Sequence, residues 1–211
     1  MGKERSRGLT WSWVLTSCIG AVIVLALPSF FRFIAERPGY LPFDPVLEHF
    51  PPVDLSTATF LVLYGTLLSG LLYLVRRPAL LLRGLQAYLF LLLLRMGSMA
   101  LITLEPPPDL IPLIDPVTQV FYPATVPFAK DLFFSGHTAT LFLLFLAIPD
   151  RRWKPALLAA TVFIGIAVIA QHVHWTIDVL AAPLGAWLAW RLSGITIRWS
   201  GGPATSAAEA A

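Results

Sequence analysis

Residues 56–75 read STATFLVLYGTLLSGLLYLV, a stretch of the chain with no charged side chain. About 20 apolar residues are enough to cross the ~30 Å hydrocarbon core of a bilayer as one helix. A membrane-spanning segment has to satisfy its backbone hydrogen bonds internally, which a helix does and an open strand does not. Arg76, Arg77 and Pro78 end the stretch. It therefore predicts a transmembrane helix, and it sets the expected fold class of the chain.

Further apolar stretches on both sides extend this prediction to six helices. The first follows Lys3, Arg5 and Arg7, as the core of a signal peptide would, but it is longer than the usual 7–15 residues and is expected to stay in the protein as a first span. The sequence thus predicts an all-α, polytopic membrane bundle with one catalytic domain over residues 11–195, a cytoplasmic segment 1–10 and a disordered tail 196–211. The other five stretches cover residues 11–35, 79–104, 132–149, 155–170 and 175–192.

The composition supports lipid as the solvent for most of the chain. Hydrophobic residues make up 57% of the sequence and charged residues 13%, whereas soluble domains carry roughly 25% charged residues. Cys18 is the only cysteine, so an intrachain disulfide and a cysteine metal site are both excluded. The net charge of +3 is small, and no nucleic-acid partner is expected.

The distribution of charge predicts the orientation. With a cytoplasmic N-terminus, eleven of the 15 Lys and Arg residues fall on the cytoplasmic side of a six-span bundle, and nine of the 12 acidic residues, Asp115 among them, fall on the other side. Cytoplasmic loops are enriched in Lys and Arg. We therefore expect both termini in the cytoplasm. The four histidines, at positions 49, 137, 172 and 174, then all lie at the non-cytoplasmic face, as a single catalytic site there would require.

The segment SGHT at 135–138 opens the fourth apolar stretch. Ser135 is a favoured N-cap residue, and Gly136 allows a close backbone approach. A helix N-terminus binds anions, and His137 could donate a proton to an oxyanion there. The alternative interpretation is an ordinary interfacial histidine beside a helix cap.

The segment HWTID at 174–178 opens the sixth apolar stretch. His174 and Asp178 are four residues apart and share one helix face. A carboxylate that binds one ring nitrogen fixes the tautomer and activates the other nitrogen as a nucleophile. The alternative is a structural cap or ion pair, although an acidic residue inside an apolar span is a functional hypothesis by default.

Arg95 lies well inside the third apolar stretch. A cation at that depth needs a polar cavity or a partner, and a guanidinium suits the geometry of a phosphate. The alternative is a structural pair with Asp131 or Asp178. A metal held by His137, His172, His174 and Asp178 is a further alternative, but His172 and His174 are two residues apart and would diverge on a helix. We expect no metal.

Taken together, these motifs resemble the type 2 phosphatidic acid phosphatase superfamily, which shares six spans and an S-G-H…H-x-x-x-D signature. The sphingomyelin synthase branch is the closer resemblance. Val168 stands where the phosphatase branch usually has Arg, and Trp175 stands where the synthases usually have Tyr. Over residues 50–190 the synthase-like segments are PPVD at 51–54, the set Arg95, Met99, Thr103 and Pro107, DLFFSGHT at 131–138, and HWTIDV at 174–179.

The resemblance implies a two-step lipid phosphotransferase that needs no cofactor. His174 would attack the phosphorus with Asp178 orienting it, and His137 would protonate the departing group. The phospho-histidine would then pass its headgroup to a diacylglycerol- or ceramide-like hydroxyl. Two alternatives are a lipid phosphatase with water as acceptor and a non-catalytic transporter or lipid-binding protein. The expected substrate-binding residues are Arg95, Asp131, Ser135 and Gly136.

Overall fold

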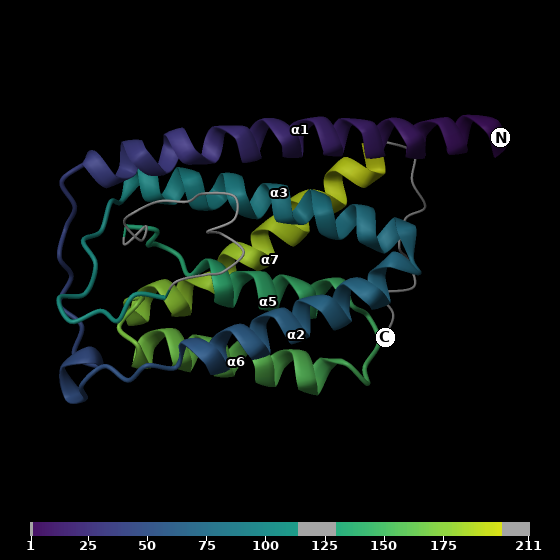
Figure 1. Cartoon of the computed structure of the whole chain (residues 1–211). Helices are drawn as coiled ribbons and strands as arrows, with labels where there is room; N and C mark the ends of the chain where they lie inside the picture. Colours follow the sequence, from purple (N-terminus) through teal and green to yellow (C-terminus); the bar gives the residue numbers. More distant parts are fainter. Residues whose placement is uncertain (1, 114–129, 200–211) are drawn as a thin grey trace.

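The computed structural model describes residues 2–113 and 130–199, and these residues contain helices but no strand. The helices lie side by side along one axis (Figure 1). Their bounds are α1 Gly2–Glu36, the short 3-10 helix η1 Leu47–His49, α2 Ser56–Val75, α3 Pro78–Leu101, α5 Gly136–Ala147, α6 Lys154–Ala170 and α7 Thr176–Trp199.

Successive helices run in alternating directions, so the connections gather at the two ends of the bundle (Figure 1). We call one end the loop end: it holds residues 37–55, 102–113, 130–135 and 171–175. The opposite end carries the N-terminus and the short basic connections after α2 and α5. Residues far apart in the sequence therefore meet at the loop end.

The helices confirm the all-α prediction, and their ends have local causes. Pro78 and Pro155 occupy the first turns of α3 and α6, where the missing proline N–H is not needed. Ser135 is the N-cap residue of α5, so the first residues of the fourth apolar stretch are not helical. The last helix continues to Trp199, which makes residues 196–199 of the predicted tail helical. Asp115 and residues 200–211 lie outside the described residues.

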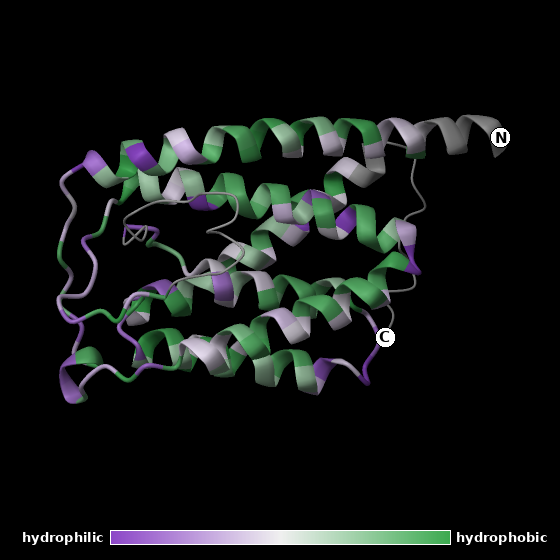
Figure 2. Cartoon of the chain, viewed as in Figure 1, coloured by the Kyte–Doolittle hydropathy of each residue, from purple (hydrophilic) through white to green (hydrophobic). Residues whose placement is uncertain are grey.

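Three helices are long and apolar enough to cross a membrane: Gly8–Glu36 within α1, α2 and α3. The shorter α5 has 12 residues, which is ~18 Å at 1.5 Å per residue and less than a hydrocarbon core. The six-span count and the orientation therefore stay predictions. The helices are largely apolar, and polar residues are concentrated in the connections at the two ends of the bundle (Figure 2). This arrangement is that of a membrane protein.

Small side chains let α3, α5 and α7 approach closely. Alanine and glycine at helix interfaces permit this in membrane proteins, where dispersion contacts hold the helices together. The main core cluster lies between these three helices and contains Ala87, Leu91, Phe134, Ala139, Leu143, Ala182, Ala186 and Ala189. Phe134 is the member that comes from the loop end, and it ties residues 131–135 to the core.

Gly185 provides the space for that phenyl ring. A Cβ atom added at Gly185 would lie 2.3 Å from the ring of Phe134, a separation too short for carbon atoms. The Phe134 ring therefore packs directly on the backbone of α7. Because Phe134 immediately precedes Ser135, this contact fixes where α5 begins relative to α7.

Gly185→Ala is expected to destabilise the fold by about 1–3 kcal/mol, the usual cost of overpacking a core. The matched control is Gly65→Ala in α2, where an added Cβ would meet no atom within 4 Å and where alanine should stabilise the helix by about 0.5–1 kcal/mol. Thermal unfolding in detergent measures both. A second substitution, Phe134→Leu, should restore part of the stability, and equal melting temperatures for the two alanine variants would contradict the packing argument.

Candidate active site

His174 and Asp178 form a buried pair at the loop end. Nδ1 of His174 lies 3.3 Å from Oδ2 of Asp178, and the same oxygen accepts a hydrogen bond of 3.2 Å from the backbone N–H of Trp175. Asp178 is fully buried, and its other oxygen, Oδ1, has no hydrogen-bond partner among the described residues. The sequence predicted this pairing from the four-residue spacing. The carboxylate fixes the imidazole on its Nδ1 side.

The first turn of α5 is joined to this pair through the backbone. The N–H of Ser135 donates to the backbone oxygen of Asp178 over 3.0 Å. Ser135 occupies the predicted N-cap position but makes no side-chain cap bond; its hydroxyl pairs with that of Thr138 at 3.1 Å. His137 is the second residue of α5 and is half-buried. The start of α5 therefore lies against the start of α7.

Arg95 reaches this junction from α3. Its Nε donates to the backbone oxygen of Phe134 over 3.1 Å, and a Cβ added at Gly136 would lie 2.6 Å from its Nη1. Gly136 is thus needed for the guanidinium to lie against the first turn of α5. No acidic residue lies in that turn. The positive charge of Arg95 and the positive end of the helix dipole therefore coincide.

Asp131 is the partner of Arg95. Its Oδ1 lies 2.7 Å from Nη2 of Arg95, which confirms the structural pair that the sequence left open as an alternative. The side chain of Asp131 is one-third exposed and that of Arg95 is 11% exposed. The pair holds the guanidinium in place, and a role of Arg95 and Asp131 in substrate binding stays a prediction.

The four histidines all lie at the loop end, because each belongs to a connection there or to the first turn of α5. They do not form one cluster in the manner of a metal site: among residues 2–113 and 130–199, no group of three His, Cys, Asp or Glu side chains could share a metal ion. His172 packs edge-on against Phe50, and its Nε2 is buried with no hydrogen-bond partner in the described chain. Its backbone has a positive φ of 55°.

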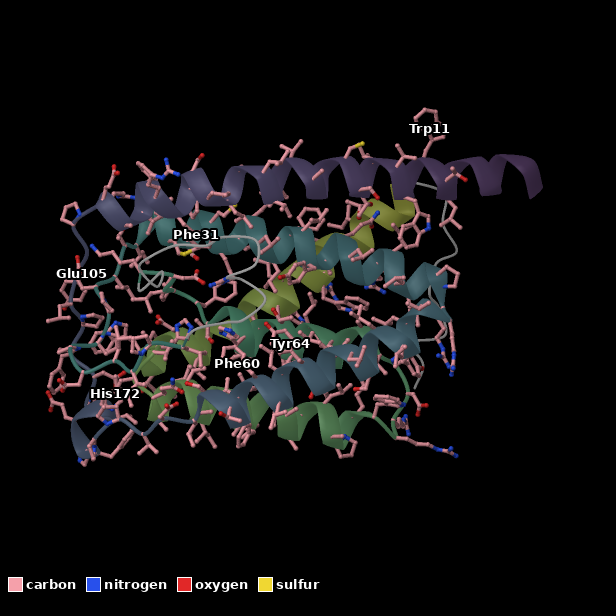
Figure 3. All side chains as sticks on the ribbon, viewed as in Figure 1. Trp11, Phe31, Phe60, Tyr64, Glu105 and His172 are labelled. Atoms are coloured by element: carbon pink, nitrogen blue, oxygen red, sulfur yellow. The ribbon has the colours of Figure 1, made fainter. Side chains whose placement is uncertain are left out.

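Glu105, which sequence analysis did not single out, joins three segments at the loop end. Its side chain accepts hydrogen bonds of 2.8 Å from the Gly39 N–H and from Nζ of Lys130, and its backbone oxygen accepts one of 2.9 Å from Nε1 of Trp175. The bond from Lys130, with that from Gly39, holds the pKa of Glu105 below its ordinary value. Glu105 and His172 lie at the same end, away from the outward-pointing Trp11 (Figure 3).

Hydrogen bonds of the Gln171 side chain join the turn that carries His174 to two other segments at the loop end. Its fully buried amide accepts from the Leu55 N–H and donates to the Ser56 hydroxyl and to the backbone oxygen of Ile111. The backbone N–H of Ile111 donates a hydrogen bond to the backbone oxygen of Gln171. In the sequence, the only sign of this role is that residue 171 is a glutamine, because the partners of its side chain lie 60 or more residues away.

The site residues at 131–138 and 174–178 lie in one continuous region of sequence similarity to known proteins. Residues 130–194 match the family model of the PAP2 superfamily C-terminal domain. The match covers 65 of the 211 residues and supports a similarity of this segment to the PAP2 superfamily. Arg95 lies outside the matched segment, and the sphingomyelin synthase branch stays a prediction. No curated protein and no solved structure matched the chain.

Proposed function

We propose that this PAP2-like protein transfers a phosphate-containing headgroup from a phospholipid to a lipid hydroxyl through a phospho-histidine. The observation that carries the proposal is the buried His174–Asp178 pair, whose helix start is bonded through Ser135 to the first turn of α5. A nucleophile with its orienting carboxylate, beside a helix start that carries an arginine, is a set of groups that can perform phosphoryl transfer.

The first step forms a bond from His174 to phosphorus. Because Nδ1 faces Asp178, the lone pair of Nε2 is the one available for attack. As the P–N bond forms, the bond from phosphorus to the diacylglycerol oxygen breaks, and His137 donates its proton to that oxygen. In the second step, His137 takes the proton of the acceptor hydroxyl, whose oxygen attacks phosphorus and releases His174.

The first turn of α5 is the better of the two helix starts for the non-bridging phosphate oxygens. The first turn of α7 already holds the carboxylate of Asp178, which disfavours a second anion. The first turn of α5 has no acidic residue, and Arg95 lies against its Gly136. Ser135, Gly136 and Arg95 would therefore bind the phosphate, and Asp131 would take part in substrate binding by holding the guanidinium of Arg95 in place.

The loop end, and with it the site, is proposed to face away from the cytoplasm. The opposite end carries Arg76 and Arg77 after α2 and the basic residues 151, 152 and 154 between α5 and α6. Lys and Arg concentrate in cytoplasmic loops. A substrate in the outer leaflet would then reach the site.

Incubation of the purified protein with a phospholipid labelled in its headgroup phosphate tests the proposal. Label should appear in a new lipid only when diacylglycerol or ceramide is present. Release of free phosphate or free headgroup without an acceptor would contradict transfer and would indicate hydrolysis, as the lipid phosphatase alternative predicts. No turnover of any phospholipid would favour a transporter or lipid-binding protein.

A further inference from the structure

Asp44 makes an unusual connection between the first loop and the start of α7. This residue lies between α1 and η1, outside the segment that matches the PAP2 family model, and it is buried. Its Oδ2 accepts the backbone N–H of Thr176 at 2.6 Å, and its Oδ1 accepts the Thr176 hydroxyl at 3.1 Å. Oδ1 also accepts the N–H of Val46 at 3.0 Å. Both carboxylate oxygens are thus used.

The position of Thr176 gives these bonds their significance. Thr176 is the first residue of α7, where backbone N–H groups have no partner inside the helix. A carboxylate there satisfies one of these groups and interacts favourably with the helix dipole. Caps usually come from the residue just before the helix, whereas Asp44 lies 132 residues away.

Thr176 also lies midway between the two members of the pair. It follows His174 by two residues and precedes Asp178 by two. A change in the backbone at Thr176 therefore changes the relative position of the imidazole and the carboxylate. Trp175 packs with Leu47, Leu104 and Leu132 in one apolar cluster. The first loop therefore contacts this turn through Leu47 as well as through Asp44.

We propose that Asp44 is a positioning residue: it caps α7 from the first loop and so sets the geometry of His174 and Asp178. Asp44 does not need to touch the phosphate for this role. The catalytic part of the inference rests on the function proposed above, whereas the structural part, the dependence of the His174 environment on Asp44, does not.

The kinetic test compares Asp44→Ala with Asp44→Asn. A lost cap should lower kcat by roughly 2- to 30-fold with KM nearly unchanged, because only the geometry of the pair is altered. Asparagine caps nearly as well as aspartate, so Asp44→Asn should restore most of kcat. Glu48→Ala, an exposed acidic residue in the same loop, is the control and should match the wild type. An Asp44→Ala variant with wild-type kcat, or with a changed KM alone, would overturn the proposal.

A second measurement does not depend on activity. The chain has four histidines, so ¹⁵N-histidine labelling in detergent gives four pairs of ring signals, one for Nδ1 and one for Nε2 of each residue, and His174→Asn assigns the pair of His174. Asp44→Ala should shift the ring signals of His174, because the first turn of α7 loses its cap, while Glu48→Ala should leave them unchanged. Unaltered ring signals of His174 in Asp44→Ala would refute the structural role, even if wild-type protein turned over no lipid. Absence of turnover together with shifted His174 ring signals would instead reject the proposed function and retain the positioning role.

Discussion

His174→Asn is expected to reduce headgroup transfer by at least roughly 10³-fold, because the substitution removes the nucleophile. Asparagine is smaller than histidine and remains polar, so the substitution leaves the rest of the buried turn nearly intact. The effect should appear in kcat, measured by the conversion of labelled phospholipid to the acceptor lipid. The melting temperature should stay close to that of the wild type.

His172→Asn is the matched control for this experiment. It replaces the same residue type two positions earlier, and asparagine tolerates the positive φ of 55° found there. The ring of His172 packs against Phe50, whereas the carboxylate of Asp178 faces His174, so His172→Asn should leave kcat near its wild-type value. Equal losses in the two variants would indicate a general disturbance of the turn and would remove His174 from the mechanism.

Asp178→Asn is expected to lower kcat by about 10²- to 10⁴-fold with little change in KM. The amide keeps the size of the carboxylate but cannot stabilise the positive charge that develops on His174 as it attacks phosphorus. Asp178 is fully buried, and its carboxylate faces Nδ1, so bulk water cannot replace this stabilisation.

Steady-state kinetics with a thermal unfolding control measure this effect. Asp150→Asn offers a comparison at the opposite end of the bundle, where the carboxylate accepts the N–H of Arg152 and should not influence the reaction. A wild-type kcat for Asp178→Asn would mean that the His174–Asp178 contact is only a structural cap or ion pair at the start of α7. This is the alternative that the sequence left open.

The helices were predictable from sequence because lipid leaves few options for an apolar chain. The predicted run 56–75 coincides with α2, and the run 155–170 differs from α6 by one residue at its start. The fourth run was predicted too long: residues 132–135 are not helical, because Phe134 packs on Gly185 and Ser135 is the N-cap of α5. Hydrophobicity alone cannot distinguish a buried segment that is not helical from a helix.

The parts of the site that depend on local spacing were also predictable. The four-residue separation of His174 and Asp178 gives their contact directly, and the depth of Arg95 in an apolar stretch indicated a partner, which is Asp131. Asp44, Glu105 and Gln171 were missed. Each of them makes a hydrogen bond to a segment that lies 60 or more residues away in the sequence, and no local pattern encodes such pairs.

The stereochemical course at phosphorus tests the central claim, that His174 takes the headgroup before the acceptor does. A phospholipid with one sulfur in a known configuration on phosphorus serves as donor, and ³¹P NMR gives the configuration of the product. Two successive in-line displacements, first by His174 and then by the acceptor, predict overall retention. Inversion would mean that the acceptor attacks the donor directly, and it would contradict the phospho-histidine mechanism.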